Sequence, residues 1–175
     1  MKIIRRFGIV FLAAWLAGCS TVQTVGGEKL AGTASWALLP FANHTETPQA
    51  GLRAEAIAAN LLRGHGVAKL QTYPAGLVAE TLLEPADRKL ADKAMAWARE
   101  QGVRYAVSGE VNEWRYKVGI DGEPAVGFTL QVLDLNDGRV VYSAVGGKSG
   151  WSREALSAVA QKLMKDMVAG IPLTK

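Results

Sequence analysis

The spacing of apolar residues after position 33 alternates between strand and helix patterns. A short apolar run from Trp36 to Phe41 predicts a buried first strand. Thr47 and Pro48 then suggest an N-cap with proline at the first helical position, and Gly64 suggests the helix end. The apolar stripe of this helix comprises Leu52, Ile57, Ala58, Leu61 and Leu62. A second strand is expected over Val67–Tyr73.

A second helix is expected from Pro85 or Asp87 to Gln101, with Gly102 as its stop. Its apolar face comprises Leu90, Ala91, Ala94, Trp97 and Ala98. This stretch follows a poorly patterned segment, residues 77–84, for which no element is predicted.

Strand spacing returns at Val103, but its phase changes once. Odd positions are apolar or small from Val103 to Val111, whereas Trp114, Tyr116 and Val118 occupy even positions. An inserted residue near Asn112 explains the change, so we predict a β-bulge or a strong twist that turns the distal half of the strand away from the core.

The last third predicts a hairpin and a helix. Phe128–Leu135 and Arg139–Val145 are expected strands around an Asn-Asp-Gly turn, and glycines 146, 147 and 150 loosen the chain before Ser152 caps the final helix. The apolar stripe of that helix comprises Leu156, Val159, Ala160, Leu163, Met167 and Ile171. The element order is therefore β-α-β-α-β-β-β-α. It predicts a one-domain α/β (α+β) sandwich, with a mixed sheet of about five strands and three main helices.

The N-terminal region has the composition of a targeting segment. Three basic residues precede an apolar stretch, Phe7–Leu16, that is too short to span a bilayer as a helix. Leu-Ala-Gly-Cys19 follows and resembles the lipobox of Gram-negative lipoproteins, which implies cleavage before Cys19 and acylation of this single cysteine. Ser20 after it points to the outer membrane. We expect a signal peptide over 1–18, a lipidated cysteine and flexible tether over 19–33, and a globular domain over 34–175.

The balance of charged residues and the types of reactive side chain limit the functions that we expect for this chain. Residues 1–18 carry three basic and no acidic side chains, so 20 basic against 16 acidic residues become 17 against 16 in the mature chain. That balance gives no reason to expect a nucleic-acid partner. His44 and His65 lack metal-ligand spacing, and Glu110 and Glu113 make a poor acid/base pair on one strand. We predict a protein without catalytic activity, and without a cofactor apart from the covalent lipid.

Two segments, Leu39–Gly51 (LPFANHTETPQAG) and Gly150–Ser157 (GWSREALS), together with the lipobox, resemble the PelC family of outer-membrane lipoproteins over nearly the whole chain. The resemblance implies a domain similar to the TolB N-terminal domain. It also implies a homo-oligomeric ring, dodecameric in the family, on the inner leaflet of the outer membrane. Such a ring would lie coaxial with the PelB β-barrel and guide the cationic Pel exopolysaccharide, a component of the biofilm matrix, toward export.

Two places fit these roles. Trp151 lies in a glycine-flanked loop, where it can project to the membrane interface, although it could instead cap the core beneath the last helix. Asp121 and Glu123 lie at a hairpin tip and, repeated around a ring, would form an acidic annulus that attracts a polycation. Arg115 and Lys117 partly neutralise it, and Asp121 could simply be a turn residue. Trp36 and Trp97 are expected in the core, while Trp114 is ambiguous.

Three other readings remain open. A monomeric envelope regulator resembling LpoB would bind a periplasmic synthase and usually has a longer tether. A curli-type pore resembling CsgG would need additional membrane-spanning strands of about ten residues, and no spare alternating segments remain for them. An unrecognised hydrolase is the remaining alternative.

Overall fold

The computed structural model describes residues 20–74, 87–119 and 122–174. Cys19, Asp121 and the poorly patterned 77–84 segment therefore lie outside the described residues. The elements are β1 (Ser20–Val25), β2 (Leu30–Ala31), β3 (Ser35–Leu38), β4 (Ala42–Asn43), α2 (Ala50–His65), β5 (Lys69–Thr72), α4 (Asp87–Glu100), β6 (Tyr105–Tyr116), β7 (Pro124–Asp134), β8 (Arg139–Ser149), α5 (Leu156–Ala169) and β9 (Leu173–Thr174).

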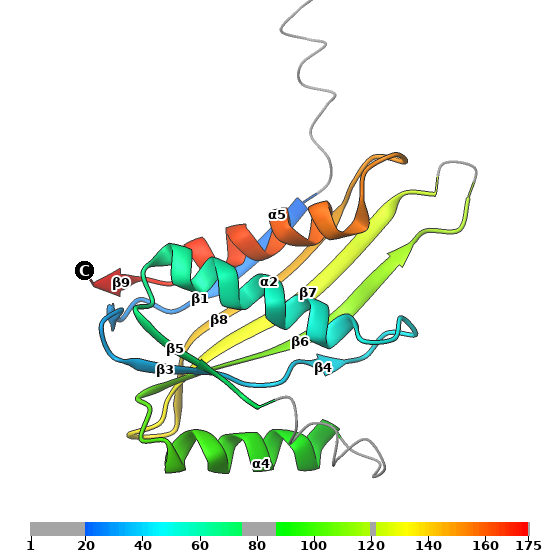
Figure 1. Cartoon of the computed structure of the whole chain (residues 1–175). Coiled ribbons are helices and arrows are strands. Elements are labelled where there is room, and N and C mark those ends of the chain that lie inside the picture. Colours follow the sequence, from blue (N-terminus) through cyan, green and yellow to red (C-terminus); the bar gives the residue numbers. More distant parts are fainter. Residues whose placement is uncertain (1–19, 75–86, 120–121, 175) are drawn as a thin grey trace, which may run out of the picture.

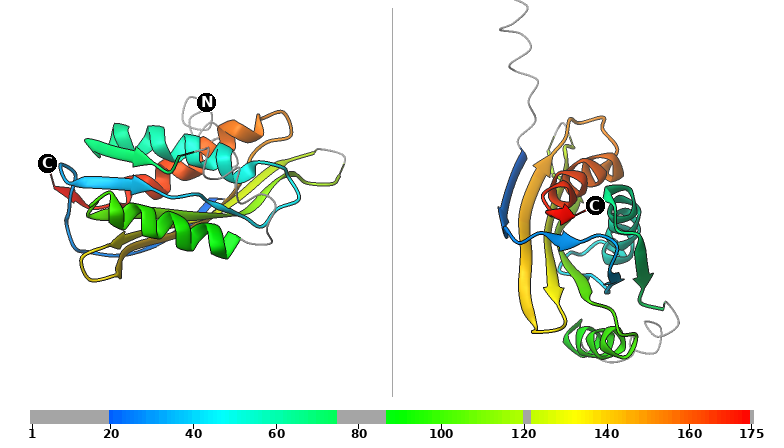
Figure 2. Two further views of the ribbon diagram at one scale, coloured as in Figure 1. Left: turned by 60° about the horizontal axis from the view of Figure 1, so that its bottom comes forward. Right: turned by 90° about the vertical axis from the view of Figure 1, so that its left-hand side faces the viewer.

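The main sheet is mixed and has seven strands in the order β1-β8-β7-β6-β3-β5, with β4 also paired to β6. Strand β3 runs parallel to β5 and β6, whereas the pairs β6–β7, β7–β8 and β8–β1 are antiparallel. Helices α2 and α5 lie side by side on one face, which we call the inner face (Figures 1 and 2). The α/β class and element order are confirmed, and the sheet exceeds the predicted five strands because β1 and β4 join it.

The apolar core has two parts because β3 is buried on both faces. Trp36 and Leu38 face the main core under α2 and α5, where the Trp36 ring lies 4.7 Å from that of Tyr105. Ala37 and Leu39 face a smaller cluster under α4. Burial on both sides explains why the run from Trp36 is continuously apolar instead of alternating.

The predicted β-bulge is present, but it does not turn Trp114 away from the core as predicted. The β6–β7 register shifts between Val111 and Glu113, which pair with Phe128 and Gly127. Trp114 is only 3% exposed, and its ring lies 6.0 Å from that of Phe128. The extra residue places Val111 and Trp114, three positions apart, on the same face, so Trp114 stays in the core, whereas Tyr116 beyond it is half exposed.

The predicted flexible tether over 19–33 is wrong for its described residues. All six residues of β1 pair with β8, and β2 pairs with β9. Val22 packs against the main core, and Leu30 is buried. Close approach is possible because Gly146 of β8 has no side chain: a Cβ there would lie 3.0 Å from the Thr21 carbonyl oxygen. The folded domain therefore extends at least to Ser20 instead of starting near residue 34.

Helix ends differ from the predictions at two caps. Helix α2 starts at Ala50, after Gln49 with φ 60°, and ends at His65, with Gly66 instead of Gly64 as the glycine that stops it. Thr47 is not the N-cap, because its hydroxyl donates to the Trp114 carbonyl over 2.6 Å. Helix α4 covers the predicted range, and the buried side of α5 matches the predicted stripe.

Candidate functional site

Three segments far apart in sequence meet at one end of the domain, which we call the hairpin end. They are the start of β1 at Ser20, the described residues of the β6–β7 hairpin (116–119 and 122–124), and the loop over 150–155 before α5 (Figure 1). Ser20 pairs with Lys148, and the Gly150 N–H donates to the Pro124 carbonyl oxygen over 2.9 Å. The residue after the predicted lipidation site is therefore held next to the loop that carries Trp151.

The 150–155 loop is shaped by Gly150. A Cβ at this position would lie 2.5 Å from a Val159 methyl carbon and 2.6 Å from a Glu154 carboxylate oxygen, so no larger residue fits without a shift. The Glu154 N–H donates to the Trp151 carbonyl over 2.8 Å and closes a turn. Trp151 stands at the outside of this turn, and its side chain projects.

The cap predicted at Ser152 is wrong. Helix α5 starts at Leu156 after Ala155, without a side-chain cap. The Leu156 N–H instead donates to the Tyr116 hydroxyl oxygen over 3.2 Å, so the β6–β7 hairpin satisfies the helix end. This bond fixes the hairpin against the Trp151 loop. Sequence reasoning missed this role of Tyr116 because the contact joins residues 40 positions apart.

Exposed apolar side chains gather at the hairpin end. Trp151 is 59% exposed, Tyr116 is half exposed, and Val118 is fully exposed. The other tryptophans differ: Trp36 and Trp114 are buried, and Trp97 is half-buried with its ring edge-on to Tyr73 at 5.4 Å. The alternating apolar residues at positions 114, 116 and 118 could have indicated an exposed apolar stripe with Tyr116 and Val118, but this pattern by itself predicts only a strand.

The carboxylates of this end are paired with cations. Glu123 lies 3.6 Å from the Lys117 ammonium, which also donates to the Ser149 hydroxyl over 2.7 Å. Glu154 accepts a hydrogen bond from Lys162, and that bond lowers the pKa of the Glu154 carboxyl. The acidic character predicted for Glu123 is therefore locally compensated, and the remaining predicted acid, Asp121, lies outside the described residues.

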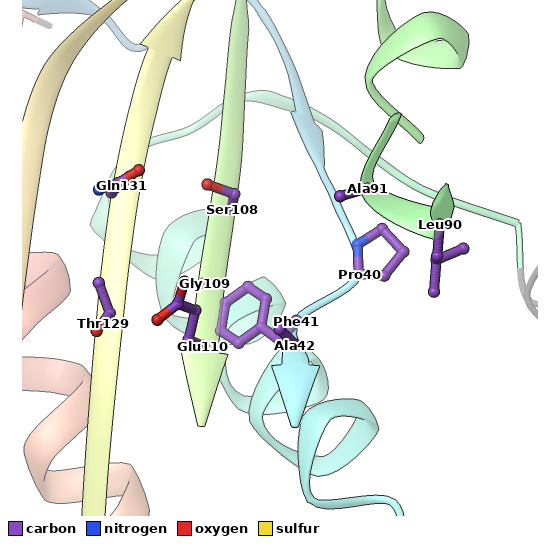
Figure 3. Close-up of a pocket in the computed structure, with 10 residues that line it drawn as sticks. All are labelled: Pro40, Phe41, Ala42, Leu90, Ala91, Ser108, Gly109, Glu110, Thr129 and Gln131. Carbon is purple, nitrogen blue, oxygen red and sulfur yellow. The ribbon is translucent and has the colours of Figure 1, made fainter. Parts of the chain in front are cut away.

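A cavity of about 190 Å³ lies on the opposite, outer face of the sheet (Figure 3). It is lined by the β3–β4 connection, α4 and strands β6 and β7, and the Phe41 ring lies against Gly109. Its acidic residue, Glu110, lies 3.9 Å from His44. The second histidine, His65, has its Nε2 2.9 Å from the Ile171 carbonyl oxygen, so the two histidines lie apart in different contacts.

The described ranges hold no cluster of three or more His, Cys, Asp or Glu side chains suited to a metal ion. In the same ranges, no helix combines the length and apolarity that a membrane-spanning helix requires. The described part of the hairpin end instead combines compensated charges with projecting apolar side chains.

The fold is found in solved structures of other proteins. The fold is shared with the lipoprotein GNA1162 from Neisseria meningitidis, at 19% identity over 77% of this chain and 95% of that chain, with a TM-score of 0.57. At this identity the likeness concerns the fold alone. No family model and no curated protein sequence matches the chain.

Two other solved structures are more similar. A PelC dodecamer from Paraburkholderia phytofirmans is 42% identical over 90% of this chain and 100% of that chain, with a TM-score of 0.76. A dodecamer of a PelC variant from the same organism is 44% identical over 86% and 96%, with a TM-score of 0.73. The chain belongs to the PelC family.

Proposed function

We propose that this chain is a non-enzymatic lipoprotein that forms a ring on the periplasmic face of the outer membrane and funnels the Pel exopolysaccharide to its export barrel. The PelC relatives from P. phytofirmans form dodecamers. The observation that carries the membrane orientation is the start of β1: Ser20, next to Cys19, pairs with Lys148, three residues before Trp151. Lipid and tryptophan would thus meet the bilayer together.

The hairpin end suits a membrane interface. Trp151, Tyr116 and Val118 offer exposed apolar surface, and tryptophan and tyrosine favour the headgroup region, where ring and polar atom are both satisfied. Lys148 and Arg153 add positive charge beside anionic lipid. Acyl chains on Cys19 contribute about 0.8 kcal/mol per buried methylene, so they supply most of the anchoring and the side chains set the orientation.

Asp121 is the proposed polymer-guiding residue. Twelve copies of one loop carboxylate would create a negative ring whose overlapping potentials attract a cationic polymer more strongly than a single site. Glu123 contributes less net charge, because Lys117 lies 3.6 Å from its carboxylate. The ring would stand coaxial with a PelB-type barrel.

The test combines a count with an export assay. The full-length lipoprotein is extracted in mild detergent, its subunits are counted by native mass spectrometry, and secreted polysaccharide is measured in a strain that lacks the native gene. We expect a large oligomer, loss of membrane attachment in Cys19→Ala, and reduced export with an intact oligomer in Asp121→Ala. Glu123→Gln, a matched acidic change, should reduce export less.

A monomeric extract that still activates a periplasmic synthase would contradict the ring and favour the regulator resembling LpoB. An Asp121→Ala variant that exports normally would remove the polymer-guiding role but leave the ring in place. The two results therefore separate assembly from transport.

A further inference from the structure

The two edges of the main sheet are protected differently. Strand β5 has four residues, begins with Lys69, and is followed by Pro74. Short length, lysine and proline are the devices with which proteins prevent unwanted strand addition. Strand β1 has six residues, Ser-Thr-Val-Gln-Thr-Val, without charge, proline or a bulge in its register with β8. An edge strand of this kind is a template for pairing.

The outer face beside β1 is also free of charge. Val25 pairs with Ser143, and Gln23 pairs with Val145, so these four side chains project from the same face. Val25 is 76% exposed and Val145 is 52% exposed. No charged residue occurs in β1 or between positions 140 and 147 of β8, in a chain with 21% charged residues. Depletion of charge with exposed aliphatic groups is typical of the centre of a protein interface.

No described element covers this surface. Helix α5 lies on the inner side of β1, β8 and β7, with α2 beside it over β6 and β5, and α4 packs under β3 and the start of β6 (Figure 2). Val22 points inward and packs against the core, so β1 is firmly attached while its edge and outer face stay open. We call this edge and face, formed by β1 and residues 140–147, the β1 surface.

We propose that the β1 surface is one half of the contact between neighbouring copies of this chain in the ring. This inference rests on the proposed function. A ring needs a heterologous interface, in which one surface of each subunit meets a different surface of the next. The opposite edge, β5, is protected, so an open β1 surface supplies the asymmetry that a heterologous contact requires.

The occupant is a second copy for two reasons. The relatives at 42% and 44% identity form dodecamers, so each of their subunits contacts other copies of its own chain. In addition, β1 starts directly after the predicted lipid-bearing Cys19. Anchored copies would share one plane, and the β1 edge of each would face sideways along the membrane toward its neighbour.

The test introduces charge at each edge in the full-length lipoprotein, extracted in mild detergent and counted by native mass spectrometry. Gln23→Lys should reduce the oligomer to monomers or small fragments of the ring. The same change on the protected edge, Gln71→Lys, should leave the subunit count unchanged. Circular dichroism must show that both variants are folded.

A second measurement does not depend on disruption. A photo-cross-linking p-benzoylphenylalanine side chain introduced at position 23 of the assembled protein should give covalent ladders on irradiation, because it reacts with whichever surface of the neighbour it touches, whereas the same side chain at position 71 should give at least tenfold less product. This measurement decides the matter if Gln23→Lys fails to fold. A wild-type count in Gln23→Lys, or no ladder from the photo-cross-linker at position 23, would overturn the assignment of the β1 surface while the ring stands. A monomeric wild-type extract would overturn the ring as well.

Discussion

The two faces of the sheet differ although the same strands build them. On β7, Phe128 points inward under α5 and is buried, whereas its neighbour Thr129 points outward and is partly exposed. Among the described residues, two helices cover the inner face, whereas on the outer face α4 covers β3 and the start of β6. The difference teaches that most of the buried apolar contacts, and with them most of the folding energy, lie on one face. The rest of the described outer face stays open to solvent.

The largest expected effect comes from truncating the inner face. Phe128→Ala should lower the free energy of unfolding by about 3–5 kcal/mol, because it removes a fully buried ring beside Trp114 and leaves a cavity. Thr129→Ala should cost less than about 1 kcal/mol, since it removes one exposed hydrogen bond with Asn112. Urea denaturation of both variants measures the difference. Equal losses would contradict the contrast between the faces.

The sequence predicted the buried elements better than the exposed ones, because apolar patterns follow burial. Apolar stripes located α4, most of α5 and the bulge in β6. Strand β1 was missed because Ser-Thr-Val-Gln-Thr-Val has the composition of a polar linker. It forms a strand because it pairs with β8, where Gly146 allows the two backbones to approach closely. Such pairing is a tertiary property that local patterns do not contain.

The hairpin end shows the same limit. The exposure of Trp151 followed from its glycine-flanked loop, whereas the bond between Tyr116 and Leu156 joins two distant segments. The compensation of Glu123 by Lys117 was foreseen from their closeness in sequence. Local contacts were thus predictable, and those between distant segments were not.

A second prediction tests glycines on the two faces. Gly109→Ala should destabilise the domain by about 1–3 kcal/mol, because its Cβ would lie 2.6 Å from the buried Phe41 ring. Gly147→Ala places its Cβ 3.9 Å from the nearest atom, the Val126 carbonyl oxygen, and should change stability by less than about 0.5 kcal/mol. Thermal denaturation followed by circular dichroism compares them. A larger loss at Gly147 would mean that the outer face is more tightly packed than the structure indicates.

A third prediction concerns Glu55, a partly buried carboxylate on α2. The Glu55 carboxylate accepts a hydrogen bond from the Phe41 N–H over 3.0 Å, and burial raises the pKa of Glu55 above 4.5. The folded state then binds the proton more tightly than the unfolded state. The stability contributed by protonated Glu55 is therefore present below pH 4.5 and is lost as the pH rises through the folded pKa.

Glu55→Gln keeps an acceptor oxygen for Phe41 and removes the titration. The stability of the wild type relative to this variant should therefore fall as the pH rises above 4.5 and then level off. Urea denaturation between pH 4 and 8 measures this difference, with Glu46→Gln, an exposed glutamate, as the control. A difference that grows with pH would contradict a raised pKa for Glu55.

The smallest effect on stability is expected at the hairpin end, where an exposed side chain is built for contact outside the domain. Trp151→Ala should change the free energy of unfolding by less than about 0.5 kcal/mol, because the side chain is 59% exposed. In a Cys19→Ala background, the same change should weaken flotation with phosphatidylethanolamine–phosphatidylglycerol vesicles about tenfold, or about 1.4 kcal/mol. Leu52→Ala on α2 removes a similarly exposed apolar side chain away from the hairpin end and should leave flotation unchanged. If both variants float equally well, the exposed apolar groups of the hairpin end do not orient the domain on lipid.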